Sequence, residues 1–334
     1  MARPVEPVVA ISLGDPGGIG PEIVAAALAA APPDARHVVF GHWPSFERAL
    51  GAAPNRPTVE LVPEIREPGP GESLFVHCGP DCPPIAGPSA AGARAQLAAL
   101  DAAVDAVLAG HAGLLVTAPV SKALIATLEP GFRGHTEYLA RRCGLDPDAV
   151  TMVFASASGP AVGLVATHLP LRDVPASVTP ARLARTASHL ARVARCLHTA
   201  SRPRIALAAL NPHGGEDGLI GDEERLVLAP FVAGAADHSD FVLVGPLPAD
   251  CVFRRALAGE FDAVIATYHD QALIPIKLGG IGTFANVTMG LPFVRTSPDH
   301  GVAYDLAGGG GADPAGMRLA LALGARLEGC DRVV

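Results

Sequence analysis

Short apolar runs alternate along the chain with longer Ala-, Leu- and Arg-rich stretches of helical period, and this alternation constrains the fold most strongly. It is typical of βα units around a parallel sheet. The apolar runs lack strict polar alternation, as expected of strands that helices cover on both faces. We expect strands at 8–13, 37–40, 113–117, 151–155, 162–167, 204–210, 241–244 and 262–267. We expect helices at 21–31, 90–109, 136–143, 180–197 and 223–236, and a last one after Asp313.

The length of the chain predicts two domains. It has 334 residues, and single hydrophobic cores stop growing at about 250–300 residues. We expect two α/β/α domains, the first made of about 1–130 plus 270–334 and the second of about 131–269, with a cleft between them. The Pro- and Gly-rich stretch 67–88 is predicted to be a loop or hairpin.

Charge and composition exclude several classes of partner. A net charge of −8 and an aromatic content of 4% do not fit a nucleic-acid-binding protein. The longest Ala/Val-rich run, 23–31, is far shorter than the roughly 20 residues of a membrane span. The start of the chain lacks a signal-peptide pattern, and the cysteines are too sparse for a disulfide scaffold. We therefore expect a cytoplasmic protein without a nucleic-acid or membrane partner, in which a local basic pocket for one anion remains possible.

The run 14–22, GDPGGIGPE, directly follows the first expected strand. Glycines between a strand and a helix let the backbone approach a ligand, and a helix N-terminus attracts anions. The run is not the G-x-G-x-x-G dinucleotide fingerprint. It fits a tight structural turn as well as a binding loop, so the cofactor-binding residues stay unassigned.

Three of the twelve histidines share one position relative to the expected strands. His168, His213 and His269 each follow an apolar run, and ligands of open parallel sheets bind beyond the carboxyl ends of the strands. Three imidazoles with an open fourth position form a known catalytic metal arrangement. A single histidine of this kind is more often an ordinary hydrogen-bonded residue, so the residues alone leave both interpretations open.

A second set of residues is typical of a site for a small phosphorylated or carboxylated ligand. Lys277, Asn286 and Arg295 lie in or beside a Gly-rich run, where Arg offers bidentate pairing and Lys a mobile point charge. The alternative is a solvated loop with surface cations, which suits Lys277 better than Arg295. His135 and Thr136 stand at an expected helix start, which indicates either an anion site or a simple helix cap.

An acidic stretch follows His213, with Asp222, Glu223 and Glu224 at its end. We expect a solvated loop that leads into a helix. The alternative is that these carboxylates orient metal ligands.

Several long motifs resemble the 4-hydroxythreonine-4-phosphate dehydrogenase family, which catalyses an NAD(P)-dependent step of pyridoxal phosphate synthesis. The resemblance runs from about Ile11 to the final helix. The motifs that carry it are GDPGGIGPE, GHTEYLA, ATHLPL, NPHGGEDGLIGDEE, GPLPAD, and ATYHDQALIPIK through NVTMGLPFVRTSPDHG.

The resemblance implies a fold like that of isocitrate and isopropylmalate dehydrogenases, with the active site in the interdomain cleft. It also implies a homodimer, in which dimer contacts of the second domain let the two subunits share the active site. It implies NAD or NADP as cofactor and one divalent metal ion, Zn, Mg or Co, per active site. By motif, the metal ligands are His168, His213 and His269, and the substrate-binding residues are His135, Thr136, Lys277, Asn286 and Arg295.

The chain departs from the family pattern at Cys251, where Thr is common, at Val302, where HGTA is usual, and in the Gly-rich GGGGADPAG. These changes fit a side branch that oxidises threonate or erythronate 4-phosphate. Distant relatives oxidise a cyclic dihydrodiol, but Lys277, Asn286 and Arg295 favour a phosphorylated substrate.

The expected reaction is oxidation of 4-phosphooxy-L-threonine to 2-amino-3-oxo-4-phosphooxybutanoate, which decarboxylates to 3-amino-2-oxopropyl phosphate. Asp250 and Asp270 are the candidates for the group that accepts the hydroxyl proton. The rival class is a metal-dependent hydrolase or lyase that uses the same three histidines, and a non-enzymatic binding protein is a more distant alternative.

Overall fold

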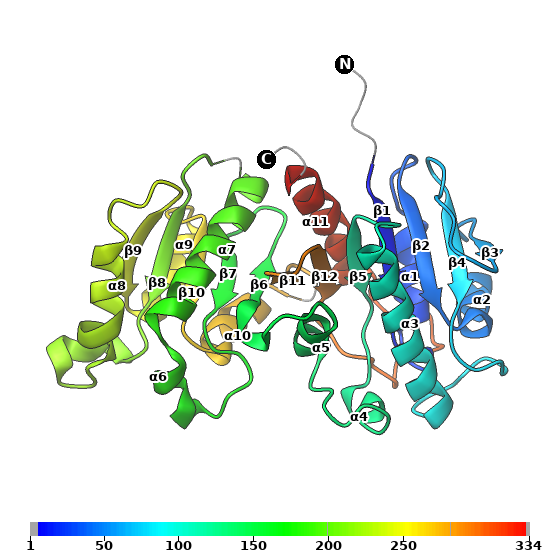
Figure 1. Ribbon diagram of the computed structural model, residues 1–334, viewed down its shortest axis with the longest axis horizontal. Coiled ribbons are helices and arrows are strands. Elements are labelled where there is room, and N and C mark those ends of the chain that lie inside the picture. The colour runs from blue at the N-terminus through cyan, green and yellow to red at the C-terminus, as the bar shows by residue number, and fades with distance from the viewer. Residues whose placement is uncertain (1–5, 199, 281, 332–334) are drawn as a thin grey trace, which may run out of the picture. The chain divides into compact units, whose positions relative to one another are not determined.

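The computed structural model describes residues 6–198, 200–280 and 282–331, and these form two compact α/β units (Figure 1). Unit 1 comprises Met1–Pro147, Ile281–Asn286 and Leu291–Val334, and unit 2 comprises Asp148–Gly280 and Val287–Gly290. The predicted α/β class is confirmed. Among the described residues, no helix is both long and apolar enough to cross a lipid bilayer.

The bounds of the units differ from the expected domain division in two longer segments and in Val287–Gly290, which belongs to unit 2. Residues 131–147 belong to unit 1 and residues 270–280 to unit 2. The first segment carries α5 (His135–Arg142), whose Arg142 forms ion pairs with Asp101 and Asp105 of unit 1. The second carries most of α10 (His269–Lys277), which packs on two strands of unit 2. These contacts explain why each segment folds with its unit.

The sheet of unit 1 has the order β3-β4-β2-β1-β5-β12, and all of these neighbours are parallel. Helix α3 packs on β1, β2 and β5, in front of the sheet in Figure 1. Helix α1 contacts both α2 and α11, and α11 also packs on β5 and β12. The strands are β1 (Val8–Ser12), β2 (Arg36–Gly41), β3 (Glu60–Val62), β4 (Ser73–His77), β5 (Leu114–Thr117) and β12 (Val294–Pro298). The helices are α1 (Gly20–Leu28), α2 (Trp43–Ala52), α3 (Ala90–Leu108), α4 (Lys122–Ile125), α5 and α11 (Ala315–Asp331).

The core of unit 1 follows from its sequence pattern. Every residue of β1 and β5 is buried, which is why these strands read as continuous apolar runs. Burial of one Val, Leu or Ile side chain contributes about 1.5–3 kcal/mol. Ser89 caps α3 by accepting a hydrogen bond from the backbone of Gly92 at 3.0 Å, as its position before a helical Ala run predicts.

The sheet of unit 2 has the order β6-β7-β10-β8-β9, with an antiparallel first pair and parallel pairs thereafter. Helix α7 covers β7, β8 and β10 in front, and α9 and α10 lie behind them in Figure 1. The strands are β6 (Thr151–Ala155), β7 (Ala161–Leu164), β8 (Arg204–Ala208), β9 (Val242–Leu247) and β10 (Ala263–Ala266), and the chain leaves the unit through β11 (Ala285–Met289). The helices are α6 (Val174–Ser177), α7 (Pro180–His198), α8 (Ala229–Gly234), α9 (Ala249–Leu257) and α10.

Two stretches differ from their expected structure. The stretch 67–88 contains β4, which pairs in parallel with β2 and β3, so it is not a hairpin. The Gly-rich run expected as a ligand loop contains β11 and β12, and both Asn286 and Arg295 therefore lie on strands. Short strands flanked by Gly and Pro carry a weak signal in a single sequence, which explains both differences.

Candidate active site

The three histidines of unit 2 follow three neighbouring parallel strands. His168 follows β7, His269 follows β10 and His213 follows β8, in the order β7-β10-β8 across the sheet. The carboxyl ends of parallel neighbours lie at one edge of a sheet. The three histidines therefore follow the carboxyl ends of neighbouring parallel strands, and their role as metal ligands stays a prediction.

His168 and His269 lie beside each other, with ring centroids 5.5 Å apart and the rings tilted by 45°. Nδ1 of His269 is 2.7 Å from a carboxylate oxygen of Asp270. A carboxylate on one ring nitrogen fixes the tautomer and leaves Nε2 for a metal ion. Asp270 is thus placed to orient His269.

His213 lies in a left-handed turn. His213, Glu216 and Asp217 have φ values of 52°, 46° and 55°, and left-handed backbone costs a non-Gly residue roughly 1–2 kcal/mol. The ring is exposed, and its Nδ1 is 2.9 Å from Glu216. Strain of this kind persists only where the surrounding structure enforces it.

Buried Glu224 enforces the turn that carries His213. Its carboxylate accepts hydrogen bonds from the backbone of Leu210 at 2.8 Å and of Asn211 at 2.7 Å, and from the Asn211 side chain at 2.8 Å. The acidic stretch was expected to be a solvated loop, and for Glu224 that expectation is wrong because three N–H donors hold it inside the unit.

The donor types around the three histidines suit a divalent metal ion, because imidazoles with carboxylate-bound Nδ1 atoms are common metal ligands. No three His, Cys, Asp or Glu side chains lie close enough together to hold an ion in the described part of the chain. The single chain brings two of the predicted ligands together and leaves His213 on its own loop. The metal assignment therefore stays a prediction.

Arg295 is the centre of a buried polar cluster in unit 1. It lies on β12, is 1% exposed, and its Nη2 donates a hydrogen bond of 2.6 Å to Thr117 at the end of β5. Burial lowers its pKa to about 9, and the carboxylate of Glu137 acts in the opposite direction. A guanidinium kept in the interior at such a cost is typical of a site for an anion.

His135 and Thr136 begin α5 next to this arginine. Burial, together with the positive charges of Arg295 and Lys122, holds the pKa of His135 well below its ordinary value, so its ring is neutral. Its Nε2 is buried and has no hydrogen-bond partner among the described residues, and the same is true of Oδ1 of Asn286. Buried polar atoms in proteins nearly always have a hydrogen-bond partner. A bound ligand would supply the missing partner here.

Lys122 lies at the edge of this cluster with its side chain exposed, and the sequence did not single it out. A Cβ atom placed on Gly134 would lie 3.5 Å from Nζ of Lys122 and 3.2 Å from Oε2 of Glu137. Lys122 begins α4, shortly after the end of β5, and its approach to Gly134 is a tertiary contact. The only hint of a binding role in the sequence is that Lys122 shortly follows a strand end.

The remaining predicted residues lie in unit 2. Lys277 ends α10 and is exposed. Asp250 lies in the first turn of α9 and is exposed too. Neither of these positions tests the role predicted for the residue.

The GDPGG turn of unit 1 is held by the buried carboxylate of Asp15. It accepts hydrogen bonds from the backbone of Gly17 at 2.9 Å, from Gln96 at 3.1 Å and from the phenol of Tyr304 at 2.6 Å. Gly14 has a φ of +71°, and a Cβ atom there would lie 2.3 Å from the Pro119 carbonyl. Only glycine fits this turn.

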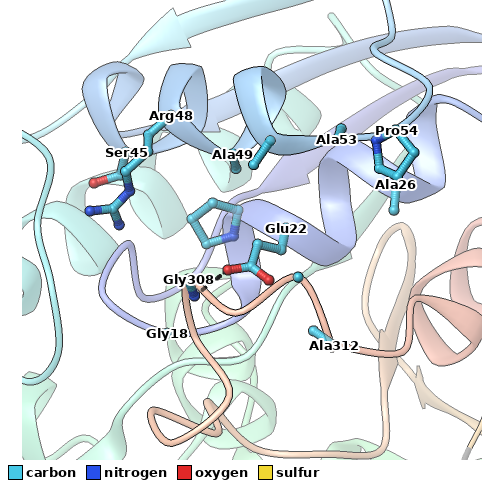
Figure 2. A pocket seen from close by; sticks show the side chains of 13 residues that line it. Gly18, Glu22, Ala26, Ser45, Arg48, Ala49, Ala53, Pro54, Gly308 and Ala312 are labelled. Carbon is cyan, nitrogen blue, oxygen red and sulfur yellow. Dashed lines mark hydrogen bonds between the residues drawn. The ribbon is translucent and has the colours of Figure 1, made fainter.

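A cavity of about 140 Å³ lies beside this turn, between α1, α2 and the Gly-rich segment 308–312 (Figure 2). Its walls are largely apolar, with Ala26, Ala49 and Ala53 among them, and Glu22, Ser45 and Arg48 supply polar groups. Figure 2 shows the Glu22 carboxylate facing Gly308, whose backbone N–H donates to it. Oε2 of Glu22 is buried and lacks a hydrogen-bond partner within the described ranges.

Comparison with known proteins assigns the chain to a family. Residues 35–324 match the family model described as Pyridoxal phosphate biosynthetic protein PdxA. The chain belongs to this family, which confirms the resemblance of its motifs.

Its relatives define the kind of enzyme. The chain is 41% identical over 342 residues to the 4-hydroxythreonine-4-phosphate dehydrogenase of Chromobacterium violaceum, covering 98% of each sequence. It is 39% identical over 333 residues to that of Erythrobacter litoralis, covering 96% of each. The chain is therefore an enzyme, an oxidoreductase similar to these dehydrogenases.

Solved structures agree with the sequence relatives. The 4-hydroxythreonine-4-phosphate dehydrogenase of Klebsiella pneumoniae has a TM-score of 0.81 and 32% identity, over 98% of this chain and 99% of that one. A terephthalate 1,2-cis-dihydrodiol dehydrogenase of Burkholderia xenovorans has a TM-score of 0.67 and 27% identity, over 96% and 98%. The fold thus serves dehydrogenases of both phosphorylated and cyclic substrates.

Proposed function

We propose that this enzyme oxidises 4-phosphooxy-L-threonine to 2-amino-3-oxo-4-phosphooxybutanoate with NAD or NADP as hydride acceptor. The product, a β-keto acid, then loses CO₂ to give 3-amino-2-oxopropyl phosphate. The observation that carries this proposal is the buried guanidinium of Arg295 beside Nε2 of His135, which has no partner among the described residues, with the exposed ammonium group of Lys122 close by. Such a cluster favours a phosphorylated substrate over an uncharged diol.

Residues of unit 1 bind the phosphate in this proposal. Arg295 offers a planar pair of N–H donors and Lys122 a point charge. Thr136 adds a hydroxyl and backbone N–H groups at the start of α5, and His135 and Asn286 complete the set. Lys277 is assigned to the substrate's other anionic group.

His168, His213 and His269 are the proposed ligands of a divalent ion, Zn, Mg or Co, which supplies Lewis-acid stabilisation of the substrate alkoxide when bound. Asp270 and Glu216 hold the Nδ1 atoms of His269 and His213, which leaves each Nε2 for coordination. Glu224 keeps the loop of His213 in its strained conformation. The exposure of His213 fits a ligand that serves a site shared with a second subunit.

The reaction moves one proton and one hydride. The hydroxyl proton of the substrate would pass to a carboxylate of this chain, and a bound nicotinamide cofactor would supply the acceptor for the carbon-bound hydrogen as hydride. Asp250 is our candidate for the proton acceptor, because the carboxylate of Asp270 is engaged with His269. Asp270 stays as the alternative acceptor.

The cavity beside the GDPGG turn is our candidate for part of the cofactor site. Its apolar Ala walls suit a flat heteroaromatic ring, and the unpartnered Oε2 of Glu22 suits an amino group on such a ring. Exchange of Glu22 for Gln is expected to raise the KM for NAD(P) several-fold and leave the KM for the phosphorylated substrate unchanged. An unchanged cofactor KM would remove the cavity from the cofactor site.

A homodimer is proposed as the working form of the enzyme. Unit 2 exposes large apolar side chains, including Leu219 at 89% and Leu278 at 84%, and exposed apolar patches mark interaction surfaces. Light scattering on the purified protein tests this, and a monomeric mass at assay concentration would contradict it. We propose a cytoplasmic location for the enzyme, in keeping with its assignment to a metabolic reaction.

A related four-carbon phosphate is the alternative substrate. Val302 and Cys251 depart from the family pattern, and the carbonyl of Val302 accepts a hydrogen bond from Ile19 in the GDPGG segment. A change there alters the surroundings of the candidate cofactor cavity. Threonate or erythronate 4-phosphate would bind the same phosphate site.

A substrate panel separates these functions. We expect reduction of NAD or NADP with 4-phosphooxy-L-threonine, weaker reduction with threonate and erythronate 4-phosphates, and none with unphosphorylated L-threonine. A preference for either sugar-acid phosphate would transfer the assignment to the alternative. Consumption of substrate without formation of reduced cofactor would indicate a hydrolase or lyase.

A further inference from the structure

A second polar cluster lies at the carboxyl ends of β2 and β4 in unit 1, and the proposed reaction does not use it. His42 follows β2, His77 ends β4, and Cys78 and Cys82 follow β4. The rings of His42 and His77 are 5.5 Å apart. These side chains do not gather into a metal site in the described structure, so thiol chemistry is the property to consider.

Cys82 is paired with an imidazole that is held from its other side. Sγ of Cys82 lies 3.5 Å from Nε2 of His42. Nδ1 of His42 lies 2.9 Å from the hydroxyl of Ser45, and that hydroxyl accepts a hydrogen bond of 2.9 Å from the backbone of Ile85. A nucleophile, a base and a group that orients the base are the parts of an activated thiol.

The surroundings of His42 keep its ring uncharged. Its pKa is lowered by burial first and by the neighbouring His77 second, while the carbonyls of Cys82 and Pro80 and the carboxylate of Asp81 oppose this shift. A neutral imidazole is able to accept the thiol proton. Cys78 is different, because burial raises the pKa of its thiol to about 11.

Cys82 is reachable as well as paired. Its side chain is half-buried and its thiol is free, on a segment whose neighbours Asp81 and Pro83 are exposed. A small reagent is therefore able to reach Sγ from solvent. Reactive cysteines are found in such partly exposed places beside a base.

We propose that Cys82 is a reactive thiol, with His42 as its base, that forms mixed disulfides with low-molecular-weight disulfides. His42 takes the thiol proton, the sulfur attacks one sulfur of the disulfide, the S–S bond breaks, and the leaving thiolate receives the proton from His42. One disulfide bond forms and one breaks, so no other oxidant is needed. The assignment is independent of the dehydrogenase reaction.

Two hydrogen bonds at Ile85 join the segment that carries Cys82 to α2, so we expect modification of Cys82 to affect this helix. Ser45 accepts from the backbone of Ile85, and Arg48 donates to the carbonyl of Ile85 at 3.0 Å. Both side chains come from α2 and line the cavity in Figure 2. Trp43, the single tryptophan of the chain, is the first residue of α2 and directly follows His42. Its fluorescence is therefore a local reporter of the modification.

The test uses oxidised glutathione on the native enzyme, with peptide mass spectrometry to follow each cysteine over time. We expect Cys82 to be modified about 10-fold faster than the half-buried thiols of Cys143 and Cys251, which serve as internal controls. Tryptophan emission should change with the same rate in the wild type and stay constant in C82S. His42→Gln should lower the rate of Cys82 modification about 10-fold and leave the rate of Cys143 modification unchanged.

Two outcomes overturn the proposal. One is modification of Cys82 at or below the rate of Cys143 and Cys251. The other is a wild-type rate that rises only through the ordinary thiol pKa of about 8.5, whereas activation by His42 predicts a rate already at its plateau near neutral pH. The second measurement needs no variant, so it decides the question even where His42→Gln fails to fold.

Discussion

The phenol of Tyr304 donates a hydrogen bond of 2.6 Å to the buried carboxylate of Asp15, which lies 289 positions earlier in the chain. Burial and this bond raise the pKa of Tyr304 to about 12. The bond ties the GDPGG turn to the segment that precedes the Gly-rich loop of the cavity. The shape of this part of unit 1 thus depends on a contact between the two ends of the sequence.

Tyr304→Phe is expected to destabilise the protein by about 1.5–3 kcal/mol, because a buried carboxylate loses a hydrogen-bond partner. Thermal or denaturant unfolding measures this loss. Tyr268→Phe is the matched control and should change the free energy of unfolding little, since its hydroxyl makes no hydrogen bond with the described residues. Equal effects of the two variants would contradict the assigned role of Tyr304.

Arg295→Lys is expected to lower kcat/KM for the phosphorylated substrate about 10–100-fold, mainly through KM, because a point charge replaces a planar pair of donors. Lys122→Ala should act in the same direction. Exposed Arg254→Ala is the control and should leave KM unchanged. A normal KM in a folded Arg295→Lys protein would remove Arg295 from the phosphate site.

Glu224→Gln is expected to destabilise the loop of His213 by about 2 kcal/mol. The substitution removes the negative charge and replaces one carboxylate oxygen with an NH₂ group, which cannot accept from the three N–H donors. Hydrogen exchange of residues 210–221 should become faster in the variant. Glu223→Gln is the matched control, since Glu223 accepts only from the side chain of Asn211 among its described contacts. If exchange in the loop is the same in both variants, Glu224 does not hold the turn.

Acid is expected to destabilise the protein through two buried histidines. Burial lowers the pKa values of His37 and His189 to about 4. The unfolded chain therefore binds more protons between pH 6.5 and 4, and stability falls as the pH drops through this window and levels off below it. The expected loss is on the order of 2–3 kcal/mol for His37.

The free energy of unfolding of His37→Gln, measured as a function of pH, checks the contribution of His37. The variant should lose less stability between neutral and acid pH than the wild type, while exposed His111→Gln should behave like the wild type. An unaltered slope in His37→Gln would show that His37 is not the group that titrates.

Chelation is expected to abolish activity, and a divalent ion should restore it, if the three histidines hold a metal. His269→Ala should lose metal content as well as activity, whereas His238→Ala should lose neither. Full activity in a verified metal-free sample would end the metal hypothesis.

The sequence predicts the strands and helices that follow from local pattern. Fully buried β1 and β5 read as apolar runs, and α3 and α7 have clear helical periods. The runs of β4 and β12 are short and flanked by Gly or Pro, so their pairing is decided by their neighbours in the sheet. Domain bounds were missed where long-range ion pairs, such as those of Arg142, bind a helix to its unit.

The placement of candidate residues was predictable where they follow strand ends. His168, His213 and His269 were selected in this way, and Arg295 by the apolar run before it, while their roles stay predictions. Lys122 and Glu224 were missed because their roles depend on tertiary contacts, with Gly134 in one case and with Leu210 and Asn211 in the other. A carboxylate in an acidic run gives no local sign that it will be buried.

The most direct test of the proposed function is the stoichiometry of the reaction with 4-phosphooxy-L-threonine. Reduced nicotinamide is followed by its ultraviolet absorbance and CO₂ is collected from the same reaction. We predict one reduced cofactor and one CO₂ for each substrate consumed. Consumption of the substrate with no reduced cofactor, or no turnover of it by the metal-loaded enzyme, would contradict the account.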